Sequence, residues 1–131
     1  MISNKIIKDN CCININSEEQ LQREVVKYLK KTDILFTATL GEYLESPKSR
    51  RNANKDGYYR GISDILILTP SEQYNGMAIE FKSPKGTGNL TPKQRMTLSK
   101  LKIECGYFVL LSNDFVEIIT LLTKYINGIL D

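Results

Sequence analysis

The chain has 131 residues, 41% hydrophobic and 25% charged, which is the size and composition of one globular domain. It contains no histidine, so a Ser-His-Asp triad, a Cys-His pair, a His-ligated zinc site and a histidine general base are excluded. No apolar run approaches the ~20 residues that span a bilayer and no signal-peptide pattern opens the chain, so an intracellular protein without a membrane is expected.

A polar lead-in over residues 1–16 is expected before a single domain over 17–131. Ser17 and Gln20 have the spacing of a capping box, so a helix is predicted from there to about Lys31. The cysteines form no C-x-x-C pair, and we expect the third, Cys105, in the core. Cysteine chemistry is therefore not expected to carry the function.

Hydrophobic pattern and turn signals define the remaining elements. In chain order they are a strand over 34–40, a long loop over 41–61, strands over 62–69 and 77–82, a helix over 92–104, a strand over 107–111 and a helix from Asp114 to about Ile129. The resulting order, α-β-β-β-α-β-α, predicts an α/β fold with a mixed central sheet flanked by helices.

The net charge of +3 is unevenly distributed. The segment from 46 to 103 holds 11 of the 18 Lys and Arg residues but only 4 of the 15 Asp and Glu residues. Such a basic segment is typical of a surface that faces a polyanion such as nucleic acid, although a charge run is also often an ordinary solvated face.

Two carboxylates and a lysine occur in otherwise apolar strands. Asp64 lies in Ile-Ser-Asp-Ile-Leu-Ile-Leu, and Glu80 and Lys82 lie in Met-Ala-Ile-Glu-Phe-Lys. A short turn between these strands favours an antiparallel hairpin, which sets Asp64 opposite the end that carries Glu80. The three side chains are therefore predicted to converge at one end of the sheet.

A hard divalent cation fits such a set of oxygen ligands, with Mg²⁺ as the first choice and Mn²⁺ as a substitute. The metal would activate a water and polarise a phosphate oxygen, while Lys82 would position the water or stabilise negative charge. A salt-bridge cluster of Asp64, Glu80 and Lys82 in a protein that binds no DNA is the alternative interpretation of the same residues.

The motifs Gly61-Ile62-Ser63-Asp64 and Glu80-Phe81-Lys82, followed by Gln94 on a helix, resemble the PD-(D/E)xK nuclease superfamily. More closely, they resemble the virus-type replication-repair nuclease (VRR-NUC) domain, over Glu18 to Ile129. The family has proline where this chain has Ser63. The resemblance implies a restriction-endonuclease-like core and is compatible with a viral or phage origin.

The resemblance also implies roles for individual residues. Asp64, Glu80 and the backbone carbonyl of Phe81 would be metal ligands, and Lys82 would be the catalytic lysine. Gln94 would orient the lysine, the water or the phosphate, although a glutamine at this helix position also closes a capping box. Glu18, on the inward face of the first helix, would be an outlying metal ligand, or would only complement the helix dipole.

The function implied is that of an Mg²⁺-dependent endodeoxyribonuclease that cleaves branched DNA in replication and repair. Small members of the family resemble homodimeric Holliday-junction resolvases, so a four-way junction and a homodimer are expected. A catalytically inactive nucleic-acid-binding module on the same fold is the alternative.

The DNA surface is predicted from the basic residues on either side of the strand pair. They are Lys48, Arg50, Arg51, Lys55 and Arg60 before Asp64, and Lys85, Lys93, Arg95, Lys100 and Lys102 after Lys82. The last helix is apolar on several faces and is one candidate for a dimer interface, although these residues equally suit a core.

Overall fold

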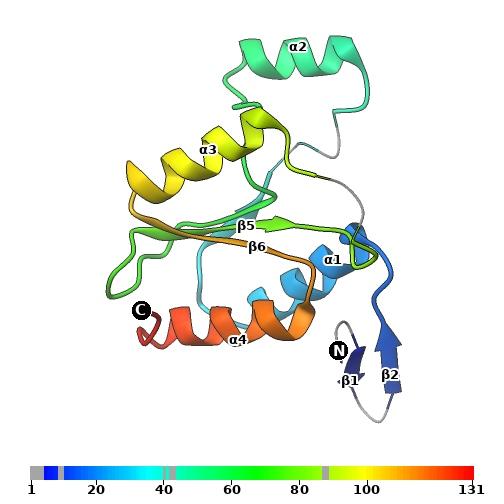
Figure 1. Cartoon of the computed structure of the whole chain (residues 1–131), viewed down its shortest axis with the longest axis vertical. Coiled ribbons are helices and arrows are strands. Elements are labelled where there is room, and N and C mark those ends of the chain that lie inside the picture. Colours follow the sequence, from blue (N-terminus) through cyan, green and yellow to red (C-terminus); the bar gives the residue numbers. More distant parts are fainter. Residues whose placement is uncertain (1–4, 9–10, 40, 42–43, 87–88) are drawn as a thin grey trace.

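A four-stranded mixed sheet forms the centre of the domain in the computed structural model, which describes residues 5–8, 11–39, 41, 44–86 and 89–131 (Figure 1). The strand order is β3-β4-β5-β6; the first two pairings are antiparallel and the last is parallel. The strands are β3 (Phe36–Ala38), β4 (Ile65–Ile67), β5 (Gly76–Phe81) and β6 (Tyr107–Ser112). The predicted mixed sheet is thus confirmed.

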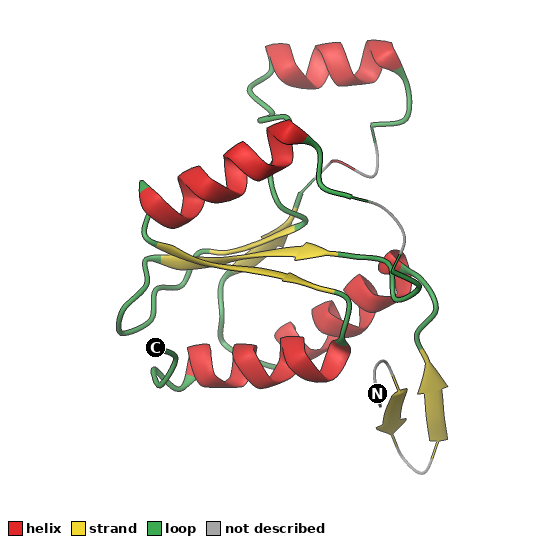
Figure 2. Cartoon of the chain, in the orientation of Figure 1, coloured by secondary structure: helices red, strands yellow, loops and turns green. Residues whose placement is uncertain are grey.

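Three helices cover the two faces of this sheet. Helices α1 (Glu18–Leu29) and α4 (Phe115–Ile126) lie on one face, and α3 (Pro92–Ile103) lies on the other (Figure 2). Ser17 caps α1 by accepting from the N–H of Gln20, as the sequence predicts. Among the described residues, no helix is long and apolar enough to cross a membrane.

The hydrophobic core lies between the sheet and the helix pair α1 and α4. Ile65 pairs with Ile79 and Ile67 with Met77, so these four side chains share one face of the sheet. The helices add Leu21, Val25, Leu29, Ile118, Leu122 and Tyr125. Because side chains alternate along β5, Glu80 projects from the opposite face to Ile79.

Three elements are absent from the predicted order α-β-β-β-α-β-α. A hairpin of β1 (Lys5–Lys8) and β2 (Cys11–Asn14) precedes α1, and α2 (Pro47–Lys55) lies within the segment predicted as a loop. Helix α2 has no buried side chain, and a helix without an apolar stripe gives no hydrophobic periodicity to detect. Ser46 and Pro47, at its N-cap and first position, are the sequence signal that marks it.

The prediction that Cys105 lies in the core is wrong, because its side chain is exposed. Cys105 follows Glu104, the C-cap of α3, and precedes Gly106, whose φ of 72° turns the chain toward β6. The residue therefore belongs to the connection beyond the helix and not to the helix face that packs on the sheet.

Candidate active site

Strands β4 and β5 bring Asp64 and Glu80 together. The antiparallel register pairs Ile65 with Ile79, so Asp64 stands opposite Glu80 at the next position. The N–H of Phe81 donates a hydrogen bond of 2.9 Å to Oδ2 of Asp64. The predicted antiparallel hairpin is confirmed, and its register sets the spacing of the two carboxylates.

The Glu80 carboxyl group is buried without enough partners to compensate for its charge. Its side chain is 5% exposed, and among the described residues Oε1 has no hydrogen-bond partner. Burial and the neighbouring Asp64 carboxylate raise the pKa of Glu80 to about 8. Burial also raises the pKa of Asp64, partly offset by the Phe81 N–H. The pair is thus deficient in positive charge.

Lys82 supplies part of that positive charge from the residue after β5. Its ammonium group acts to lower the pKa of both Asp64 and Glu80. Within the described part of the chain, however, the ion pairs are Arg23 with Glu19 and Lys27 with Glu24, both on α1. Lys82 is therefore near the carboxylates without being locked to either in a salt bridge.

Glu18 joins this group from the first turn of α1. Burial and then the Asp64 carboxylate raise the pKa of Glu18, while Lys82 and the backbone N–H of Ser83 act to lower it. No three Asp, Glu, Cys or His side chains of the described residues are gathered closely enough to form a metal-ligand set. Glu18 accordingly lies at the edge of the Asp64–Glu80 pair.

Gln94 makes local contacts at the start of α3. Its Oε1 accepts a hydrogen bond of 2.9 Å from the N–H of Thr91, and its own N–H donates to Oγ1 of Thr91 at 3.1 Å. These two bonds are the capping box that the spacing of Thr91 and Gln94 predicts. A role of Gln94 toward substrate stays a prediction.

The loop that leads to Asp64 is anchored on α3. Gly61 has a φ of 87°, and a Cβ at this position would lie 2.8 Å from Cγ of Lys93 and 3.3 Å from its backbone. The ammonium group of Lys93 in turn lies 4.6 Å from the centroid of the Tyr59 ring. Glycine is therefore required at the first position of the Gly-x-x-Asp motif for this loop to approach the helix.

Tyr58 lies within range of the charges of Asp64 and Glu80, and it is not among the predicted site residues. Its side chain is partly buried, and burial followed by the charges of Asp64 and Glu80 raises its pKa. The sequence pattern does not show which of the adjacent Tyr58 and Tyr59 is the less exposed. The adjacent Tyr59 is 44% exposed.

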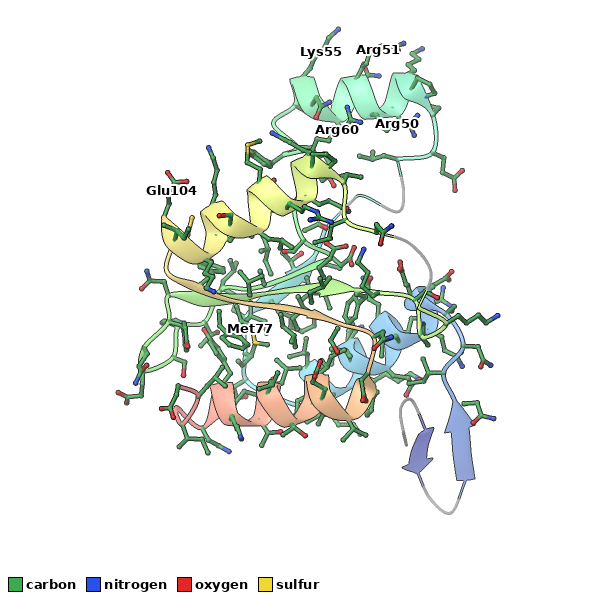
Figure 3. All side chains as sticks on the ribbon, viewed as in Figure 1. Arg50, Arg51, Lys55, Arg60, Met77 and Glu104 are labelled. Atoms are coloured by element: carbon green, nitrogen blue, oxygen red, sulfur yellow. The ribbon has the colours of Figure 1, made fainter. Side chains whose placement is uncertain are left out.

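The predicted DNA-binding residues lie on separate elements. Figure 3 shows Arg51 and Lys55 on the outer side of α2, away from the sheet. Arg50 instead donates a hydrogen bond of 3.0 Å to the carbonyl of Leu44. Among the described residues, none of the basic side chains of α2 or α3 takes part in an ion pair. Their charges are left available to a polyanion.

Two carboxylates and a lysine at one end of a mixed sheet form the arrangement expected of a PD-(D/E)xK nuclease domain. The family model of the VRR-NUC domain matches residues 4–113, so the chain belongs to this family of nucleases. A solved structure described as a VRR_NUC domain protein has 21% sequence identity and a TM-score of 0.68, over 88% of this chain and 93% of the other. That similarity supports the fold. No curated protein matches the chain.

Proposed function

We propose that the protein is a metal-dependent endonuclease that hydrolyses phosphodiester bonds in DNA. The observation that carries this proposal is the buried Asp64–Glu80 pair, in which Glu80 Oε1 has no hydrogen-bond partner among the described residues. The Glu80 carboxyl group shares a hydrogen bond with Asp64, but two adjacent buried carboxyl groups are unfavourable as ionised groups unless a cation compensates for their charge. Membership of a nuclease family supports the class of reaction.

The donor groups fit a hard divalent cation. Carboxylate oxygens of Asp64 and Glu80 and the carbonyl oxygen of Phe81, at the end of β5, would hold Mg²⁺, and Mn²⁺ would substitute. Glu18 would act from the edge of the site. When bound, the cation supplies Lewis-acid chemistry, polarising a phosphate oxygen and lowering the pKa of a water.

The remaining residues of the site act on the water and the phosphate. Lys82 is not held in an ion pair with a described residue. It is therefore free to orient the attacking water or to stabilise the negative charge of the pentacoordinate transition state. Gln94 would assist by orienting the same groups if its side chain leaves the capping box. Neither role requires histidine, which the chain lacks.

DNA is the proposed partner, in branched form such as a four-way junction. Helix α2 supplies Lys48, Arg50, Arg51 and Lys55, and Arg60, Lys85, Lys93 and Arg95 follow along the chain. These side chains would contact phosphates more than bases, giving affinity with little sequence preference. A catalytically inactive DNA-binding module would use the same surface without cleavage.

Cleavage assays on defined substrates test this proposal directly. Labelled four-way, flap and linear duplex DNA are incubated with the protein and Mg²⁺, Mn²⁺ or EDTA. The proposal expects cleavage that requires metal and is fastest on the four-way junction. Binding without cleavage under all three conditions would instead support the inactive module, and equal rates on every substrate would contradict the preference for branched DNA.

Reversing charges on the outer side of α2 is expected to weaken DNA binding. Arg51→Glu combined with Lys55→Glu removes two phosphate contacts, so the slope of log K against log salt should become shallower by about 2 units. Arg50 is left intact because it holds the Leu44 carbonyl. Binding is measured with Ca²⁺ in place of Mg²⁺ over a range of salt concentrations.

The matched control for this variant is Lys30→Glu with Lys31→Glu. Both lysines are exposed at the end of α1, on the sheet face opposite to α3, and the change in net charge is the same (Figure 1). The control should keep the salt slope of the unmodified protein. An equal loss of DNA affinity in the two double variants would show that net charge, and not the α2 surface, governs binding.

A symmetric homodimer is the proposed assembly, because two sites related by a two-fold axis match a four-way junction. The structure uses Ile118, Leu122 and Tyr125 of α4 in the core, while Val116 and Ile126 of α4 remain 50% and 38% exposed. Sedimentation of the free protein at micromolar concentration should give the mass of two chains. A monomer that still cuts four-way junctions in symmetric pairs would rule out a preformed dimer.

A further inference from the structure

The C-terminus of α2 determines where Tyr58 lies. Asp56 is the C-cap, and Gly57 follows with a φ of 105°. The N–H of Tyr58 donates to the carbonyl of Ala53 at 2.8 Å, and the N–H of Gly57 donates to the carbonyl of Asn54 at 3.2 Å. These two bonds form a Schellman motif, which reverses the chain at the helix end. The first residue after the reversal is Tyr58.

The Tyr58 hydroxyl group lies beside Gly41, three residues beyond the end of β3. A Cβ placed on Gly41 would be 3.2 Å from Oη of Tyr58. Just before this point, the N–H of Thr39 donates a hydrogen bond of 2.9 Å to the carbonyl of Asp64. The hydroxyl therefore lies near the strand end that pairs with the Asp64 backbone.

A phenol in this position remains a hydrogen-bond donor. Burial and the charges of Asp64 and Glu80 both oppose ionisation of Tyr58, which keeps the hydroxyl proton at neutral pH. Carboxylates that hold a cation are ionised and can only accept hydrogen bonds, so the site with metal bound would otherwise have few neutral donors to offer an anionic phosphate. Tyr58 supplies one neutral donor from the segment between α2 and Asp64, whereas Lys82 lies after β5.

We propose that Tyr58 is a catalytic residue whose hydroxyl group donates a hydrogen bond to a non-bridging oxygen of the phosphate that is hydrolysed. This inference rests on the proposed nuclease function. It also links the two functional regions, because Tyr58 is the residue that directly follows the capped end of α2. Contact of α2 with the DNA backbone would then fix the donor relative to the scissile phosphate.

Tyr58→Phe removes the hydroxyl group and keeps the ring, and Tyr59→Phe is the matched control. Tyr59 is the neighbouring tyrosine, 44% exposed, and phenylalanine preserves its ring beneath Lys93. Single-turnover cleavage of a four-way junction by Tyr58→Phe should be about 10- to 100-fold slower, as expected for loss of one hydrogen bond to a charged oxygen. Cleavage by Tyr59→Phe should stay within about two-fold of the unmodified rate.

Two further measurements separate a contact with phosphate from a structural role. Thermal unfolding and DNA affinity in Ca²⁺ should be unchanged in Tyr58→Phe. A phosphorothioate at the cleaved position replaces one non-bridging oxygen with sulfur, which is a poorer acceptor. For one diastereomer, the slowing by sulfur should be smaller in Tyr58→Phe than in the unmodified protein, because the lost hydrogen bond no longer contributes.

Each outcome distinguishes this inference from the proposed function. If the unmodified protein and Tyr58→Phe cleave at equal rates, the role of Tyr58 is wrong and the nuclease function stands. Additive effects of sulfur and Tyr58→Phe for both diastereomers, or a parallel loss of DNA affinity, would likewise overturn the contact. If the unmodified protein does not cleave with any metal, both the function and the inference are wrong.

Discussion

Asp64→Asn and Glu80→Gln should each abolish DNA cleavage while leaving a folded protein. Both substitutions keep the size of the side chain and remove a negative oxygen ligand, so they should lower the single-turnover rate by about 10³-fold or more. The core is unaffected, because Glu80 projects from the face opposite to Ile79. Cleavage of a labelled four-way junction in Mg²⁺ measures the effect.

The same variants separate metal binding from general damage to the fold. Without metal at neutral pH, Glu80→Gln should unfold at the same temperature as the unmodified protein or higher. Burial raises the pKa of Glu80 to about 8, so this carboxyl group ionises in the unfolded chain but not in the folded one, whereas the amide does not ionise. Addition of Mg²⁺ should raise the unfolding temperature of the unmodified protein but not of this variant.

Glu104→Gln is the control, since Glu104 is exposed at the far end of α3 (Figure 3). This variant should retain both cleavage and the rise in unfolding temperature with Mg²⁺. Retention of near-normal cleavage by Asp64→Asn or Glu80→Gln would show that the metal site lies elsewhere.

Lys82→Ala should nearly abolish turnover while metal binding persists. The ammonium group cannot coordinate a cation, so its loss should leave metal binding intact. The cleavage rate should fall by about 10²- to 10³-fold, because the attacking water is no longer oriented or the charge on the phosphate is no longer stabilised. The rise in unfolding temperature with Mg²⁺ should remain, and should even increase, because a positive charge beside the carboxylates is removed.

Lys30→Ala is a suitable comparison for Lys82→Ala, because Lys30 is an exposed lysine at the C-cap of α1. It should behave as the unmodified protein in both measurements. If Lys82→Ala loses the metal-induced stabilisation together with cleavage, Lys82 has a structural role in the carboxylate cluster.

The central pair of the site could be predicted because two strands and a short turn determine it. An antiparallel hairpin has one register in which the apolar residues of β4 and β5 share a face, and that register sets Asp64 opposite Glu80. Local patterns also gave the caps at Ser17 and Thr91. These features depend on residues that are neighbours in sequence or in one hairpin.

The parts that sequence analysis missed depend on contacts that leave no periodic pattern. Helix α2 buries none of its side chains, so hydrophobicity does not report it. Tyr58 and Tyr59 are adjacent and chemically alike, and the sequence does not show that Tyr58 is partly buried within range of the carboxylates while Tyr59 is exposed. For Gln94 the sequence supports two roles, because its position three residues after Thr91 fits both a helix cap and a catalytic role.

The absence of buried side chains in α2 has a consequence for how the protein accommodates its substrate. A helix of 9 residues is marginal in water by itself, and α2 is held by capping at its two ends and not by packing. Its local opening should therefore need far less free energy than unfolding of β5, whose residues are all buried. Part of the binding energy on DNA is then used to order this segment, which lowers affinity but lets one surface adjust to phosphate backbones of different geometry.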